Sequence, residues 1–221
     1  MIFLNNYLSK TMLLLLSLVL IFPSFTNAEE TKQAEGQTAV QPISQKTVQL
    51  RVNLRELWTE HAFWTEKFIV SAIAGLEDQE PVLARLLKNQ DELGNAIKPY
   101  YGEEAGNQLA QLLRGHILIA GKVVAAAKSG NQADFKKYNT DWFKNADDIT
   151  NFLSAANPNY NKKELNDMMY VHLKLITDGV VAKLQKDWNA NITALDKNQD
   201  HLMHMADFLS NGIIKQFPNK F

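Results

Sequence analysis

Apolar residues recur three and four positions apart along most of the chain, which is the period of an amphipathic α-helix. From Asn53 to the C-terminus the sequence keeps this spacing and lacks the apolar-polar alternation of half-buried strands. The chain is therefore expected to be all-α, with six helices. Their predicted ranges are about 53–74, 81–97, 104–128, 133–157, 161–188 and 192–217.

Capping residues and helix breakers define these predicted ends. Asn53 with Glu56, and Asn161 with Glu164, have the spacing of a capping box, in which each residue satisfies a free backbone N–H of the first turn. Gly75 is expected to end the first helix, since glycine readily adopts the left-handed conformation of a C-terminal cap. The other predicted boundaries are Pro81, Pro99, Gly130, Pro158 and Pro218.

A histidine interrupts the apolar face of three of the predicted helices. His61, His116 and His172 lie 55 and 56 positions apart. A period of this length predicts a repeated supersecondary unit, here a helical hairpin of about 56 residues. Three such hairpins, spanning about residues 53–102, 103–160 and 161–221, predict a six-helix up-and-down bundle. On the returning helices a second set follows the same period: Asn89, Asn145 and His201.

Residues equally distant from a hairpin turn lie at similar heights, because each helical residue rises about 1.5 Å. With turns expected near residues 77, 130 and 187, all five histidines of the chain fall into one polar layer. The returning helices add polar pairs three positions apart, which share a helix face. These pairs are Asn89 with Glu92, Asn145 with Asp148, and His201 with His204.

Two donors on one helical turn, joined by a histidine from a facing helix, can hold a metal ion in a bundle core. Imidazole mixed with carboxylate suits a divalent transition metal such as Zn, Fe, Mn or Cu, and the sequence does not choose among them. The polar layer is therefore a candidate metal centre. Its predicted ligands are His61, His116, His172, His201, His204, Glu92 and Asp148, with Asn89 and Asn145 as supporting residues.

The same layer has a structural interpretation. A histidine on an apolar face is usually hydrogen-bonded to a neighbour, and duplication would place three of them at equivalent positions. The third repeat argues for a site, because His201 and His204 replace the amide and the acid. The hypotheses are thus an exported binding protein for a metal ion or small polar ligand, or a structural or interaction module. A metal-dependent enzyme is a third hypothesis, and it requires an open coordination position.

The first 28 residues have the pattern of a secretory signal peptide: Lys10, an apolar run through Phe22, and small residues ending at Ala28. The apolar run falls short of the roughly 20 residues that span a membrane, so cleavage and secretion, with no membrane span left, are expected. Residues 29–52 are polar and without apolar period, and we predict a disordered leader. The bundle domain would then span residues 53–221.

Composition narrows the function classes further. Removing 28 residues from 221 leaves 193, enough for one domain, with 22 basic and 24 acidic residues and a net charge of −2. No basic patch favours a nucleic-acid partner. The chain has no cysteine, which excludes disulfides and a cysteine-linked lipid. No Gly-rich phosphate loop, nucleophile elbow or zincin motif occurs, so the sequence does not favour an enzyme.

Several motifs resemble those of a family of exported bacterial all-helical proteins with no established activity. They read LWxEHxxWT at 57–65, NQxxxGNAIKPYYG at 89–102, LLxxHI at 112–117 and MAD at 205–207. The resemblance covers nearly all of the predicted bundle. It implies an exported helical protein and implies no reaction.

Overall fold

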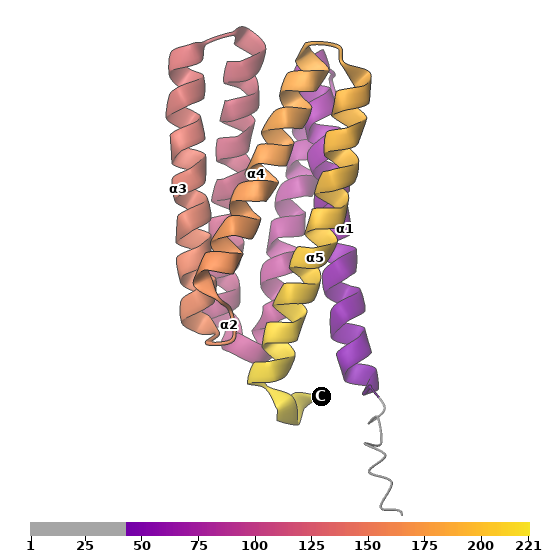
Figure 1. Ribbon diagram of the computed structural model, residues 1–221, viewed down its shortest axis with the longest axis vertical. Coiled ribbons are helices and arrows are strands. Elements are labelled where there is room, and N and C mark those ends of the chain that lie inside the picture. The colour runs from indigo at the N-terminus through magenta and orange to yellow at the C-terminus, as the bar shows by residue number, and fades with distance from the viewer. Residues whose placement is uncertain (1–42) are drawn as a thin grey trace, which may run out of the picture. The chain divides into compact units, whose positions relative to one another are not determined.

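The computed structural model describes residues 43–221, which form five long helices and one short 3-10 helix, with no strand among them. The long helices lie side by side in an elongated bundle (Figure 1). The predicted signal peptide and the leader up to residue 42 lie outside the described residues. The elements are α1 (Gln45–Ala74), α2 (Gln79–Ser129), α3 (Gln132–Ala156), α4 (Lys162–Leu184), α5 (Trp188–Gln216) and η1 (Pro218–Lys220).

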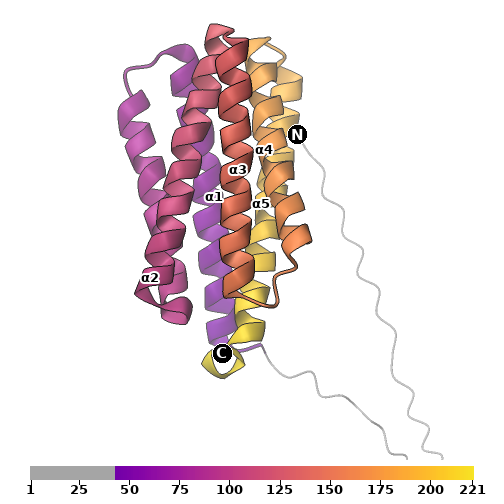
Figure 2. The same cartoon turned by 90° about the vertical axis from the view of Figure 1, so that its left-hand side faces the viewer.

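Helix α2 folds back on itself at Gly102, whose φ of 86° and ψ of 170° are not helical. A Cβ atom on Gly94 would overlap the carbonyl oxygen of Gly106, although the two residues would lie about 18 Å apart in a straight helix. The helix therefore has two antiparallel arms, residues 79–101 and 103–129 (Figure 2). The predicted six separate helices are replaced by five, one of which makes two passes.

Several helix ends match their predicted capping residues. Gly75 adopts a φ of 69° and donates its N–H to the Ser71 carbonyl, and Gly130 has a φ of 70°. The side chain of Asn161 accepts a hydrogen bond from the Glu164 backbone N–H at 3.1 Å. Local backbone chemistry sets these three helix ends, as predicted from the capping residues in the sequence.

Helix α1 begins earlier than predicted. Its N-cap is Ser44, whose Oγ accepts from the Thr47 N–H at 3.1 Å, whereas Asn53 lies inside the helix. Residues 45–52 are thus helical and do not belong to a disordered leader. The physical reason is that Leu50 extends the buried apolar face toward the N-terminus, and this burial stabilises the additional turns.

Two other predicted ends are displaced. Pro99 lies within α2, and the chain turns only at Gly102, where a residue without Cβ can adopt the positive φ. Trp188 was expected to end a helix, but it begins α5. The Asp187 side chain caps that helix by accepting from the Ala190 N–H at 3.0 Å. The two helices on either side therefore end and begin a few residues earlier than predicted, while the turn between them lies near residue 187 as expected.

One apolar cluster draws residues from all five helices, and its members are almost completely buried. Consecutive helices pack against one another, and α5 also packs against α1, which closes the bundle around this core. Each fully buried leucine contributes about 1.5–3 kcal/mol relative to exposure. Representative members are Leu54, Leu113, Ile149, Leu173 and Leu202.

Among the described helices, α2 alone meets the length and composition of a membrane-spanning helix. Core helices of bundles commonly meet the same criteria. The two arms of α2 pack extensively against α1 and α3, and they contribute Leu93 and Leu113 to the buried cluster.

Candidate functional site

Three of the five histidines meet in the bundle core. His61 lies on α1, His116 on the second arm of α2, and His172 on α4, and they are 2%, 3% and 4% exposed. The ring centroid of His172 lies 5.7 Å from that of His61 and 6.3 Å from that of His116. We call these residues the histidine cluster. Since each member belongs to a different helix, only tertiary packing brings them together.

The predicted repeat positions make the same hydrogen bond in each hairpin. Four residues before each clustered histidine, a backbone carbonyl accepts a hydrogen bond from a side chain of the returning helix. A carbonyl oxygen has a second lone pair for this bond beyond the one used in its own helix. The pairs are Asn89 Nδ2 with Leu57 O at 3.0 Å, Asn145 Nδ2 with Leu112 O at 3.2 Å, and His201 Nε2 with Met168 O at 2.8 Å.

Asparagine side chains orient two of the clustered imidazoles. Asn145 Oδ1 lies 2.7 Å from His116 Nδ1, and Asn198 Oδ1 lies 2.8 Å from His172 Nδ1. An amide oxygen only accepts hydrogen bonds, so the network assigns the proton of each ring to Nδ1 and the free lone pair to Nε2. The bond from Asn145 to the Leu112 carbonyl supports this amide orientation.

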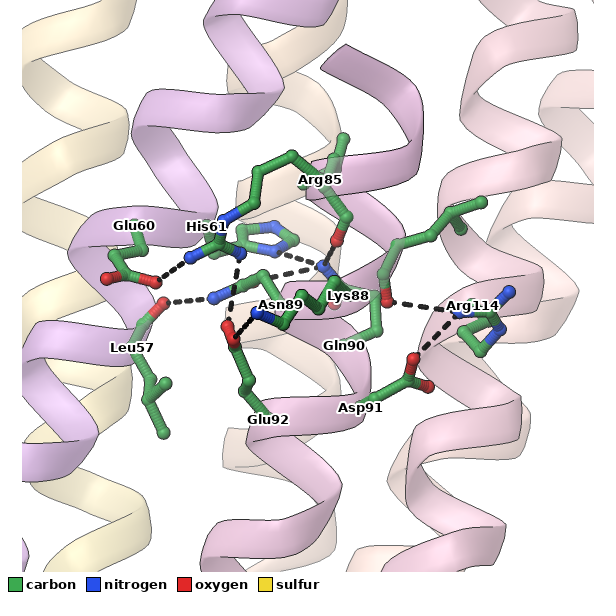
Figure 3. A network of polar contacts seen from close by, with 12 residues as sticks. Leu57, Glu60, His61, Arg85, Lys88, Asn89, Gln90, Asp91, Glu92 and Arg114 are labelled. Carbon is green, nitrogen blue, oxygen red and sulfur yellow. Dashed lines mark hydrogen bonds and ion pairs between the residues drawn. The ribbon is translucent and has the colours of Figure 1, made fainter. Parts of the chain in front are cut away.

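His61 is held differently. Its Nδ1 lies 3.3 Å from Gln90 Nε2, which also lies 2.8 Å from the Leu86 carbonyl and 3.0 Å from Asn89 Oδ1 (Figure 3). An amide nitrogen only donates, so here the network assigns a lone pair to Nδ1 and the proton to Nε2. Gln90 Nε2 carries two hydrogens for these three contacts, and the contact with His61 is the longest of them. Gln90 Oε1 has no hydrogen-bond partner among the described residues.

All three histidines line a small cavity of about 20 Å³. This is enough room for roughly one water-sized group. His116 Nε2 is buried and has no partner among the described residues, and the same is true of Thr65 Oγ1. Both side chains line the cavity, together with His61, His172 and Trp142. Residues that carry unpaired polar atoms thus border the cavity, although its surface is almost entirely apolar.

Burial keeps the histidine cluster neutral. It lowers the pKa of His61 and of His116 to about 3 and that of His172 to about 4, because a charged imidazole loses its hydration in the core. The nearby rings lower these pKa values further, since His172 opposes a charge on His61 and on His116. Metal ions bind the neutral imidazole, so the rings have the protonation state that ligation requires.

The two predicted carboxylate ligands do not reach the histidine cluster. Glu92 lies 3.1 Å from Arg85 and 3.6 Å from Lys88 near the surface (Figure 3). Asp148 is exposed and lies 3.1 Å from Lys144. The polar layer predicted from turn distances therefore has fewer members than expected, and neither predicted acidic side chain belongs to it.

The two histidines of the last helix are also separate from the cluster. His201 Nε2 is hydrogen-bonded to the Met168 carbonyl. His201 thus makes the contact that Asn89 and Asn145 make in the other two hairpins. His204 is exposed. Among residues 43–221, no group of three or more His, Asp or Glu side chains is arranged as a ready ligand shell for a metal ion.

Helix geometry explains why Glu92 does not face the core together with Asn89, as the three-residue spacing had predicted. Successive residues are about 100° apart around a helix, so a residue three positions on is rotated by roughly 60° in the opposite sense. From Asn89 this rotation leads away from the buried side marked by Leu86 and Leu93, and Glu92 faces outward. Distance from the turn predicts height along the bundle, but it does not predict which side of the helix meets the core.

Two functional partners were missed by the sequence reasoning. Gln90 and Asn89 flank the side of the helix that faces the core, one on each edge of it, and both are fully buried. Asn198 occupies a buried position on α5 between Ala194 and Leu202, one turn before His201. An amide side chain interrupting an apolar helix face was the available signal in both cases.

Aromatic and charged side chains enclose the cluster. Trp58 contacts His61 edge to face at 5.3 Å between centroids, and Trp142 contacts His116 at 5.2 Å. Outside this layer, Arg85 bridges Glu60 at 2.7 Å and Glu92 at 3.1 Å, which ties α1 to the first arm of α2 (Figure 3). The site is thus closed to bulk water and held by contacts from several helices.

Comparison with known proteins gives no match: no protein-family model, no curated protein and no solved structure is similar to the chain. The resemblance to exported bacterial proteins therefore stays a prediction.

Proposed function

We propose that the protein binds one divalent transition-metal ion between His61, His116 and His172. The observation that carries this proposal is the convergence of three buried, neutral imidazoles from three helices on one cavity. Imidazole nitrogen is a preferred ligand of Zn, Cu, Fe and Ni, and three histidines leave one position of a tetrahedral ion open.

To bind one ion, the three rings would have to move closer together. Imidazoles bound through Nε2 to one tetrahedral Zn²⁺ have centroids about 5 Å apart. The separations of His172 from His61, 5.7 Å, and from His116, 6.3 Å, exceed this by roughly an ångström, which side-chain rotation and slight helix movement would have to supply.

The hydrogen bonds to Nδ1 suit a metal site. A ligating histidine almost always donates its second ring N–H to an acceptor, and Asn145 and Asn198 are such acceptors. His61 would shift its proton from Nε2 to Nδ1 on binding. Turning the Gln90 amide would offer its free Oε1 as the acceptor, and it would break the bonds from Gln90 Nε2 to the Leu86 carbonyl and to Asn89 Oδ1.

The wider prediction of an exported, repeated fold belongs to the same proposal. The three equivalent hydrogen bonds of Asn89, Asn145 and His201 support an origin by repetition of one hairpin. The N-terminal pattern supports export after cleavage behind Ala28. Mass spectrometry of the exported protein should find Glu29 as its first residue, and an intact N-terminus would contradict this step.

The metal site is tested by titrating chelator-treated protein, residues 29–221, with Co²⁺. We expect one ion per chain, visible d–d absorption of a tetrahedral complex, and a higher melting temperature. Binding to the folded state alone stabilises it by about 2.7 kcal/mol at a hundredfold excess over Kd. A parent protein that neither binds the ion nor melts higher would contradict the proposal.

Matched variants locate the ion. His116→Gln and His172→Gln should bind Co²⁺ at least about tenfold more weakly, in line with the loss of a metal ligand. His204→Gln is the control, because that side chain is exposed and outside the cluster. Circular dichroism of each metal-free variant establishes that it is folded. Equal weakening in all three variants would place the ion elsewhere.

The second candidate function is a structural polar layer. It is favoured by the hydrogen bonding of each Nδ1 within its own hairpin, including the donation from Gln90 to His61. A water in the cavity would then accept from His61 Nε2 and donate to Nε2 of His116 and His172. In that case His116→Gln and His172→Gln melt lower than the parent whether or not metal is present.

A further inference from the structure

A second cavity lies in the bundle core, about one helical turn from the histidine cluster. Its volume is about 40 Å³, compared with about 20 Å³ for the cavity that the histidines line. Trp58, Leu113 and Met169 line it, and each of these residues precedes a member of the cluster by three positions, close to one turn of a helix. All five long helices contribute to its walls, including α3 through Ile149 and α5 through Met205. We call it the core cavity.

The walls of the core cavity offer little to which a water molecule could bind, because their surface is almost entirely apolar. Two tyrosines line it, but Tyr101 donates its hydroxyl to Gln216 Oε1 at 2.9 Å and Tyr160 donates to a backbone carbonyl at 2.8 Å. Among the lining side chains, only Trp58 has a buried polar atom, Nε1, without a partner in the described part of the chain. A buried water needs two to four polar partners, so the core cavity favours an apolar occupant.

The volume of the core cavity limits its occupant to a small molecule. About 10–15 Å³ holds one water-sized group, so a cavity of about 40 Å³ holds roughly three. Benzene binds in apolar cavities of roughly 150 Å³, so it is too large for this one. The flexible thioether side chains of Met169 and Met205 can adapt to the shape of an occupant. The size therefore fits an apolar gas molecule.

We propose that the core cavity is a binding site for a small apolar molecule of about one to three heavy atoms, a class that includes dioxygen and xenon. Transfer of the molecule from water to apolar surroundings favours its binding. Dispersion contacts with the walls add to this, since atoms that line a cavity have partner atoms on one side only. The inference does not depend on the proposed metal site, which lies in the neighbouring layer of the bundle.

The test is NMR of metal-free protein that is labelled at its methionine methyl groups and titrated with dissolved xenon. Met169 and Met205 line the core cavity, whereas Met168 and Met203 do not. We expect the methyl resonances of Met169 and Met205 to shift in a saturable way, and those of Met168 and Met203 to stay in place. Absence of a saturable shift, or equal shifts of all four resonances, overturns the proposal.

Two matched variants locate the bound xenon. Leu209 and Leu202 are both buried in the apolar cluster on α5, and Leu209 lines the core cavity whereas Leu202 does not. Leu209→Phe adds volume at the cavity and should abolish the xenon shifts of Met169 and Met205, whereas Leu202→Phe should leave them.

Circular dichroism establishes that each variant is folded. Leu153→Phe, which lines the core cavity from α3, takes the place of Leu209→Phe if the latter does not fold. Xenon shifts that persist in a folded variant of either lining residue overturn the proposal. Since the protein is free of metal throughout, this result and the Co²⁺ titration are independent, and either proposal can fail without the other.

Discussion

At the scale of single residues, the three clustered histidines couple the stability of the protein to pH. In the unfolded chain a histidine titrates near pH 6.5, whereas burial lowers the pKa of His61 and His116 to about 3 and that of His172 to about 4. Between these values the unfolded state binds protons that the folded state does not. The folded state is therefore favoured above pH 6.5 and loses stability as the pH falls below it.

Metal-free protein should accordingly become less stable from about pH 6.5 down to about pH 4, by up to roughly 1.4 kcal/mol per pH unit for each histidine. Urea unfolding across this range measures the slope. His172→Leu should reduce this slope by the contribution of about one proton. His204→Gln should leave the slope near that of the parent protein. A free energy of unfolding that does not change with pH in this range would contradict the burial of neutral rings.

The residues of the candidate site could be predicted only in part. His61, His116 and His172 were found from period and burial pattern, because a histidine on an apolar face is visible in the sequence. Gln90 and Asn198 were missed, and Glu92, Asp148, His201 and His204 were included although they lie outside the cluster. The difference depends on the angle at which each helix meets the core, which spacing alone does not give.

At the scale of elements, Gly102 determines the reversal of α2. Its φ of 86° with ψ of 170° lies in a region that essentially only glycine adopts. No other atom lies within 4 Å of a Cβ built there, so the cost of a side chain is backbone strain rather than a clash.

Gly102→Ala should therefore lower the free energy of unfolding by about 1–3 kcal/mol. Gly115→Ala on the same helix is the control, because its Cβ would make an ordinary contact at 3.6 Å and alanine favours the helix by about 0.5–1 kcal/mol. Urea unfolding compares the two. Equal stability of Gly102→Ala and the parent would mean that the turn tolerates another conformation.

At the scale of the whole molecule, all five helices share one apolar cluster, and the chain has no disulfide to hold a part of it alone. Each hairpin by itself would expose its share of this cluster and its buried histidine. The hairpins are therefore expected to fold together rather than as independent repeats.

Urea unfolding should then show one transition in which tryptophan fluorescence and helical circular dichroism coincide. The buried Trp58 and Trp142 report on packing around the cluster, whereas dichroism reports on all helices. Loss of the fluorescence change well before loss of helix would show that one hairpin separates first. That outcome would contradict a single cooperative core.

The amino-acid sequence alone determined the helical class, most helix ends and the histidines on apolar faces, because these depend on local backbone chemistry and on the period of the helix. Tertiary structure decided the fold-back of α2, the convergence of His61, His116 and His172, and the amides that orient them. These features depend on how helices rotate and pack against one another. Such contacts join residues far apart in the chain, and no local pattern encodes their angle.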